Sequence, residues 1–383
     1  GSPRCQIDGM TERLHPRENP DLTGHEAAEN QFLDAWSSGR MHHGWLISGP
    51  KGIGKATMAY RFARFLLTHG NPAQADDGGP ALFGNDEISA TSPESLAIDP
   101  HSPVFRRIAA NGHADLQVIE RGLSDDGKRM QTIIPVDKIR AVGHTMSLTA
   151  GEGGWRVIIV DGAEDMNLNS ANALLKVLEE PPPRAILFLI THAPGRLLPT
   201  IRSRCRQLKL SPLHSAQIDA LLAQRLPDLS EAERQTLFRL SDGSIGRALD
   251  LAESDGVALQ RDLLDLMNSL PTLDMATAHK FADRVALRDA DAAWRTAIDL
   301  VSRGVADIVA SGTREHGIEG RGYLPEEAAC LGRLGALAPA QRWIEAWEKN
   351  NALFARADSA NLDRKQVMLN ALTTMENAAR TGV

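Results

Sequence analysis

The sequence has 383 residues and a formal net charge of −7; 42% of it is hydrophobic and only 4% is aromatic. This length predicts two or three domains, with cores built mainly from Leu, Ile, Val and Ala. The acidic balance argues against a protein whose sole task is to coat nucleic acid. Cys5, Cys205 and Cys330 lie too far apart in the sequence for a Cys-x-x-Cys zinc site, and they do not suggest a disulfide framework.

The start of the chain carries no targeting pattern. The first twenty residues lack the apolar core of a secretion signal, and no run of 18 apolar residues occurs anywhere. Gly1-Ser2 resembles a cloning remnant, and Met10 is a candidate natural start. We expect a cytoplasmic protein without a membrane span, in which residues 1–19 form an N-terminal tail.

Apolar runs alternate with helical patterns over residues 20–211. Because these runs show no polar alternation, they are typical of parallel strands that are buried on both faces. We predict an α/β domain here, interrupted at about 69–114 by an irregular insertion rich in Gly, Pro, Asp and Ser. The predicted strands are 44–48, 116–119, 156–160, 186–190 and 207–210.

The remainder of the chain has helical patterns from Pro212 onward. We predict a small helical domain at 212–254, in which Ser230 to Glu233 form a capping box. An all-helical domain is predicted at 255–383. Its long helices carry a stripe of large apolar residues that we interpret as the core of a helical bundle. The stripe consists of Trp294, Ile298, Val301, Trp343, Trp347, Phe354, Met368 and Leu372.

A glycine-rich segment lies between the first predicted strand and a helix predicted at 55–68. Its sequence is close to the phosphate-loop pattern G-x-x-x-x-G-K-[ST]. Glycines allow backbone N–H groups to surround phosphate oxygens, while the lysine and the helix N-terminus add positive charge. We predict a degenerate nucleotide site here; the alternative is a glycine-rich turn that only caps the helix. The segment is Gly49, Pro50, Lys51, Gly52, Ile53, Gly54, Lys55, Ala56 and Thr57.

Two positions depart from a hydrolytic site. Ala56 stands where Ser or Thr would give a hydroxyl to Mg²⁺, and Thr57 is rotated by ~100° around the helix. Asp161 ends a predicted strand and is a candidate Mg²⁺ ligand. The next residue is Gly162, where hydrolysing P-loop relatives place a glutamate, and Glu164 comes two residues later. We expect ATP or ADP to bind without hydrolysis, with weak or absent Mg²⁺ binding.

Five segments, taken in order, resemble the clamp-loader branch of the AAA+ ATPases. The resemblance covers about residues 20–250, and the NALLKVLEEPP and Ser-Arg-Cys segments are its most specific parts. It implies a AAA+ P-loop domain, a helical lid and a helical collar that assembles a five-subunit ring. That ring would load a sliding clamp onto primed DNA. The segments are 49–57, VIIVDGAEDMN at 157–167, NALLKVLEEPP at 172–182, LFLITHAP at 187–194 and IRSRC at 201–205.

The resemblance also implies roles for three residues. Arg204 corresponds to an arginine that reaches into the ATP site of a neighbouring motor subunit. Thr191 corresponds to the first sensor and Arg247 to the second sensor on the lid. Without the resemblance, we would interpret Thr191 as a strand-end hydrogen-bonding residue and Arg247 as a solvated helix residue. Many family members bind zinc through four cysteines, but this chain has no cysteine from 6 to 204, so we expect no zinc or other metal.

Three hypotheses are consistent with these patterns to different degrees. We favour a non-hydrolysing structural subunit of the clamp loader. The alternative is an ATP-hydrolysing motor subunit of the same complex that uses the displaced Thr57 and Glu164. A P-loop nucleotide kinase is the third, but it would need the missing hydroxyl and would not explain the helical stretch after 212.

Overall fold

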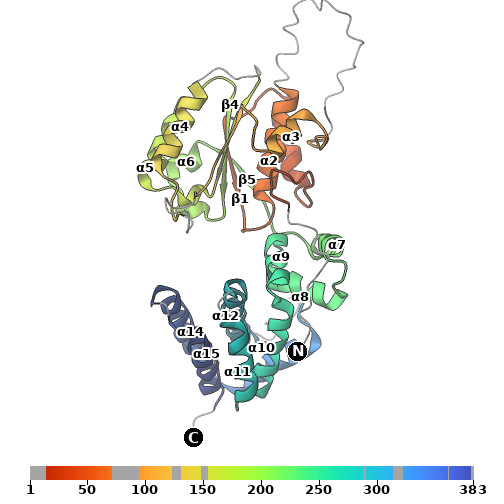
Figure 1. Ribbon diagram of the computed structural model, residues 1–383, viewed down its shortest axis with the longest axis vertical. Coiled ribbons are helices and arrows are strands. Elements are labelled where there is room, and N and C mark those ends of the chain that lie inside the picture. The colour runs from red at the N-terminus through yellow and green to blue at the C-terminus, as the bar shows by residue number, and fades with distance from the viewer. Residues whose placement is uncertain are drawn as a thin grey trace, which may run out of the picture. The chain divides into compact units, whose positions relative to one another are not determined.

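The computed structural model describes residues 14–70, 93, 95–122, 131–147, 154–287, 290–313, 322–360 and 362–380 (Figure 1). The chain divides into two compact units, residues 1–217 and 218–383. The first unit contains a parallel sheet, and the described residues of the second unit form helices. The predicted fold class, a P-loop parallel sheet followed by helices, is confirmed.

The first unit is built on a five-stranded parallel sheet of order β2-β3-β4-β1-β5. All five strands lie where the apolar runs predicted them. The register pairs Ser48 with Thr191 and Asp161 with Ile190, so β1, β3 and β4 end at one common edge. This edge carries the loop that follows β1. The strands are β1 (Gly44–Ser48), β2 (Leu116–Ile119), β3 (Arg156–Asp161), β4 (Ala185–Thr191) and β5 (Arg206–Lys209).

Helices cover both faces of this sheet (Figure 1). On one face α1 and α2 bury an aromatic cluster in which the rings of Phe32 and Phe62 stack with centroids 3.8 Å apart. On the other face α4, α5 and α6 pack aliphatic side chains against the strands. The helices are α1 (Glu26–Ser37), α2 (Lys55–His69), α3 (Pro103–Ala109), α4 (Val136–Ser147), α5 (Leu168–Glu179) and α6 (Pro199–Ser203), with 3₁₀ turns η2 (Ala163–Asp165) and η3 (Pro194–Arg196).

The stretch predicted as an irregular insertion contains a short helix, α3. The Ser102 side chain accepts a hydrogen bond from the Phe105 N–H, and Pro103 occupies the first helical turn, which is a favourable start for a helix. Phe105 and Ile108 are buried. The Ser- and Pro-rich composition of the stretch concealed this capped helix. Residues 71–92 and 94 of the predicted insertion lie outside the described residues.

The second unit is helical throughout its described residues. Helix α8 begins at the predicted capping box, where the Ser230 hydroxyl and the Glu233 carboxylate each accept a hydrogen bond from the other residue's backbone N–H. Helix α7 spans the division between the two units. The helices are α7 (Ser215–Arg225), α8 (Glu231–Ser241), α9 (Ile245–Glu253), α10 (Gly256–Ser269), α11 (Met275–Val285), α12 (Asp291–Thr313), α13 (Pro325–Leu337), α14 (Ala340–Ala360) and α15 (Arg364–Ala379).

Most of the predicted apolar stripe lies in the core of the second unit, but Trp347 does not. Trp343 is fully buried, whereas Trp347 is 41% exposed. On α14 the inward positions run from Trp343 through Ala346 and Asn350 to Phe354, in steps of three or four residues. Ala346 therefore takes the inward position that the prediction assigned to its neighbour Trp347.

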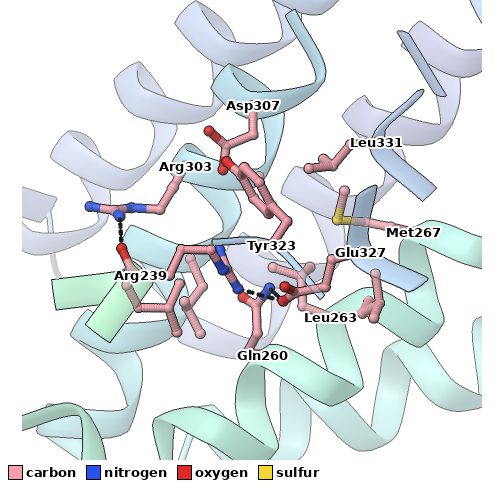
Figure 2. Close-up of a pocket in the computed structure, with 13 residues that line it drawn as sticks. Arg239, Gln260, Leu263, Met267, Arg303, Asp307, Tyr323, Glu327 and Leu331 are labelled. Carbon is pink, nitrogen blue, oxygen red and sulfur yellow. Dashed lines mark hydrogen bonds and ion pairs between the residues drawn. The ribbon is translucent and has the colours of Figure 1, made fainter. Parts of the chain in front are cut away.

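A buried polar cluster joins α8, α10 and α13 (Figure 2). Arg239 pairs with Glu327, and both residues are less than 9% exposed. The same carboxylate accepts hydrogen bonds from Gln260 Nε2 and from the Leu324 N–H, each at 3.0 Å. The Arg239 guanidinium also lies over the Tyr323 ring, 4.7 Å from its centroid. One carboxylate thus organises donors from separate segments of this unit.

Removing this carboxylate is expected to destabilise the second unit strongly. Glu327→Ala leaves the Arg239 charge buried without its partner, which typically costs about 3–5 kcal/mol. The control is Asp219→Ala, which removes the half-exposed partner of Arg234 and should cost less than about 1 kcal/mol. Urea unfolding of the full chain measures both variants. Equal losses for the two variants would contradict the assigned importance of the buried pair.

Candidate nucleotide site

The loop between β1 and α2 adopts a backbone that requires glycine. Gly49 has a φ of 152°, and a Cβ placed on it would lie 2.5 Å from the backbone oxygen of Leu210. No other residue could replace it without moving the segment after β5. The strand–loop–helix arrangement predicted from the sequence is present, with α2 beginning at Lys55.

The Lys55 side chain folds back onto this loop. Its Nζ donates hydrogen bonds to the backbone oxygens of Gly49 at 2.8 Å and Pro50 at 2.5 Å. The residue is only 8% exposed. This burial lowers the pKa of Lys55, although the carboxylates of Asp161 and Glu164 act in the opposite direction. The ammonium group therefore lies in the loop, where a phosphate oxygen could replace the carbonyl oxygens as its acceptor.

The position directly after Lys55 in α2 lacks the hydroxyl that would bind Mg²⁺. Ala56 has no hydroxyl and packs against the hydrophobic core. Thr57 is 7% exposed and lies one residue further along the helix, rotated by ~100°. That the Thr57 hydroxyl does not replace the hydroxyl missing at position 56 stays a prediction.

Asp161 lies at the end of β3 in an environment that disfavours its charged form. Burial, aided by the nearby Glu120 carboxylate, raises the pKa of Asp161, and Lys55 opposes the rise. A carboxylate must be ionised to hold a divalent cation well. Burial and Glu120 thus disfavour a negative charge on Asp161, and Lys55 favours it.

Gly162 has a backbone that disfavours the glutamate found in hydrolytic sites. Its φ is +76°, in the left-handed region, and a Cβ would lie 2.9 Å from Asp165 Oδ2. A glutamate here would add a strained backbone and would place a second carboxylate beside Asp165. The local backbone therefore favours glycine at position 162 and disfavours the glutamate that hydrolytic sites place there.

Glu164, which lies three residues after Asp161, is hydrogen-bonded to residues at the end of β4. Its side chain is fully buried, Oε1 accepts a hydrogen bond from the His192 N–H at 3.2 Å, and it also pairs with His192 Nδ1. Burial raises the pKa of Glu164, but hydrogen bonds from its own N–H, from the Thr191 hydroxyl and from His192 prevail, so its pKa lies below the usual value. Activating a water would require Glu164 to leave these partners.

Thr191 therefore has a visible structural role. It is 1% exposed, donates to Glu164, and its hydroxyl accepts a hydrogen bond from the Ala193 N–H at 3.1 Å. The predicted sensor role stays a prediction. What the structure adds is that Thr191 links η2 to the end of β4 at the same sheet edge as the phosphate loop.

Arg204 lies at the opposite edge of the sheet from the phosphate loop. Its backbone oxygen comes within 3.5 Å of a Cβ built on Gly44, the first residue of β1, whereas the phosphate loop begins after the last residue of β1. At ~3.3 Å per residue, the five residues of β1 place the two edges ~16 Å apart. The Arg204 side chain is therefore remote from the phosphate loop of its own chain.

The Arg204 guanidinium is held by two oxygens and stays partly exposed. Nη1 donates to the backbone oxygen of Thr200 at 3.1 Å, and Nη2 pairs with Glu179 Oε1 at 2.8 Å. Its side chain is 38% exposed. The neighbouring residues serve packing: Cys205 is buried, which raises its pKa to about 12, and the Arg206 guanidinium lies over the Trp45 ring.

Arg247 belongs to the second unit, in α9. Its Nη1 pairs with Asp242 at 3.4 Å and its Nη2 pairs with Asp299. The side chain is 34% exposed. The predicted sensor role concerns a nucleotide bound to the first unit and stays a prediction.

Sequence reasoning missed the residues that hold the phosphate loop from its N-terminal side. His25 is 5% exposed, and its Nε2 lies 2.7 Å from the backbone oxygen of Ile53, so this nitrogen carries the proton. Arg61 and Arg64 of α2 donate to the backbone oxygens of Pro20 and Asn19. No motif marks these residues, because their contacts join positions that are distant in the sequence.

Neither a metal centre nor a membrane span is found among the described residues. They contain no group of three or more His, Cys, Asp or Glu residues that could hold a metal ion. Nor does any described helix have the length and apolar character needed to cross a membrane.

Comparison with known proteins places these features in a family context. A family described as DNA polymerase III, delta subunit, matches residues 83–214. The DNA polymerase III subunit delta' of Pseudomonas aeruginosa is 37% identical over 203 residues, which are 53% of this chain and 53% of that protein. The Escherichia coli delta' subunit is 29% identical over 265 residues, 68% of each chain. This chain resembles the clamp-loader subunits of DNA polymerase III, and among the relatives compared it is most like delta-prime.

The similarity extends to other subunits of the same polymerase. The DNA polymerase III subunit gamma of Buchnera aphidicola is 26% identical over 270 residues, 69% of this chain and 65% of that protein. The match to the Pseudomonas relative spans about half the length of that protein. A gamma subunit-related protein from Thermotoga maritima aligns over 91% of this chain and 100% of that chain, with 18% identity and a TM-score of 0.40.

The conformation of Gly162 leads to a direct prediction about stability. Gly162→Ala should cost about 1–2 kcal/mol, because an L-residue is strained in the left-handed region. The control is Gly154→Ala, since the φ of Gly154 lies outside that region and a Cβ added there would meet nothing within 4 Å. Urea unfolding of both variants gives the difference. If Gly162→Ala were as stable as Gly154→Ala, the backbone would not be what excludes a side chain at this position.

Proposed function

We propose that this chain is a delta-prime-like structural subunit of the bacterial DNA polymerase III clamp loader. In this role it hydrolyses little or no ATP itself and supplies Arg204 to the ATP site of a neighbouring subunit. The observation that carries the proposal is the placement of Arg204 at the sheet edge opposite its own phosphate loop. An arginine there cannot assist this chain's nucleotide, but it can face a neighbour.

The incomplete home site supports the same proposal. Phosphoryl transfer depends on positioning and charge stabilisation, and Ala56 and Gly162 leave two of the usual groups missing. The retained loop glycines and Lys55 suit a phosphate, so ATP or ADP would bind without turnover. Ala56 offers no hydroxyl to Mg²⁺, so Mg²⁺ binding would be weak or absent, and no zinc is expected.

The proposed partners follow from the relatives. Gamma/tau-type motor subunits and a delta-type subunit would complete a hetero-pentamer in the cytoplasm, and the assembled complex would act on the sliding clamp and primed DNA. The similarity to gamma subunits keeps one alternative open, an ATP-hydrolysing gamma/tau-like motor subunit. The alternative requires Glu164 to leave Thr191 and His192 and to act as the water-activating base.

Replacing Arg204 in the assembled loader tests the proposal. Arg204→Ala should leave assembly intact and slow ATP turnover at the adjacent site, by up to the ~10³–10⁵-fold that a trans arginine contributes in GTPases. Arg204→Lys should restore little, because it keeps the charge and loses the planar donor fork. The measurement is ATP turnover and clamp loading by loaders rebuilt with each variant.

The matched control is Arg196→Ala, which removes the same charge from an exposed position in η3. It should turn over ATP like the wild type. If the Arg204→Ala loader assembles, turns over ATP and loads clamps at the wild-type rate, the trans-arginine assignment is wrong.

A further inference from the structure

We propose that Glu179 restrains Arg204 and that a nucleoside triphosphate presented by a neighbouring subunit displaces Glu179 from it. Glu179 is then a positioning residue that regulates the arginine, and this inference rests on the proposed function of Arg204. The Glu179 carboxylate and the phosphate of the neighbour would compete for one guanidinium. The pair would thus lower the readiness of Arg204 to engage a neighbour's nucleotide by the strength of the ion pair.

The first support is the anchoring of both partners at the amino edge of the sheet. Glu179 is the last residue of α5, and the preceding Leu178 is buried. The Leu178 backbone oxygen lies 3.0 Å from His43 Nε2, just before β1. Arg204 follows α6, where Nη1 contacts the Thr200 oxygen. The two side chains therefore meet from fixed backbone positions.

The second support is the local charge. The C-terminal end of a helix carries a partial negative charge, and Glu179 adds a full negative charge at the end of α5. The Arg204 guanidinium, 2.8 Å away, compensates this charge. While it does so, the guanidinium is less available to a second anion.

The third support is the exposure of both side chains, which allows another anion to replace Glu179 as the partner of Arg204. The Arg204 side chain is 38% exposed and the Glu179 side chain 48% exposed. Exposed ion pairs of this kind shift an equilibrium by only about 1.4- to 5-fold. A triphosphate offers more negative charge and several oxygens to the same planar donor fork, so it would displace the carboxylate. The restraint is strong enough to bias the arginine and too weak to trap it.

The test uses the reconstituted loader and the variant Glu179→Gln, which removes the charge and keeps the size. We expect kcat/KM for ATP to rise by about 2- to 5-fold, because the arginine no longer has to leave a carboxylate. The matched control is Glu180→Gln, an exposed residue that follows Glu179 in the same motif. It changes the net charge equally and should leave kcat/KM unchanged.

A double-variant cycle separates this role from a structural one. With Arg204→Ala in place, Glu179→Gln should have no effect on turnover, since its partner is gone. If Arg204→Ala slows the loader but Glu179→Gln leaves kcat/KM unchanged or lowers it, the restraint is overturned and the proposed function stands. If Arg204→Ala itself has no effect, the trans-arginine function fails, and the restraint fails with it.

Discussion

The length of the parallel strands is the constraint on which the function proposed for this chain depends. A parallel sheet has two distinct edges, and here the phosphate loop lies at one of them and Arg204 at the other. Strand β1 separates the edges by ~16 Å, at ~3.3 Å for each of its five residues. The chain can therefore offer a phosphate cradle and an arginine at the same time, but it cannot use them on the same phosphate.

At the carboxyl edge, the phosphate loop lies beside positions that lack two groups usual in hydrolytic sites, the hydroxyl at Ala56 and the carboxylate at Gly162. Gly49 keeps a backbone that only glycine adopts easily, and the Lys55 ammonium is hydrogen-bonded to carbonyl oxygens of the loop. Beyond them, Gly162 has a left-handed backbone, and Glu164 is committed to Thr191 and His192. These contacts hold the Glu164 carboxylate against the end of β4. The backbone at Gly162 and the contacts of Glu164 therefore both disfavour a water-activating carboxylate at this turn.

Much of the first unit was predictable, because its signals are local. Apolar runs located all five strands, and the glycine–lysine spacing located the phosphate loop. Prediction failed where tertiary contacts decide. Trp347 fits the helical stripe as well as Ala346 does, and only the packing of α14 shows which of them is buried. His25 carries no motif at all, since its partner is a backbone oxygen. The Glu179–Arg204 pair joins two motifs that spacing alone could not bring together.

The central claim is that this chain holds a phosphate cradle without hydrolytic capacity of its own. ATP turnover by the purified chain, measured beside its Lys55→Ala variant, tests that claim most directly. We predict turnover at the background level for both proteins. Turnover at the rate of ordinary AAA+ motors that is lost in Lys55→Ala would contradict the claim, and it would favour the motor-subunit alternative.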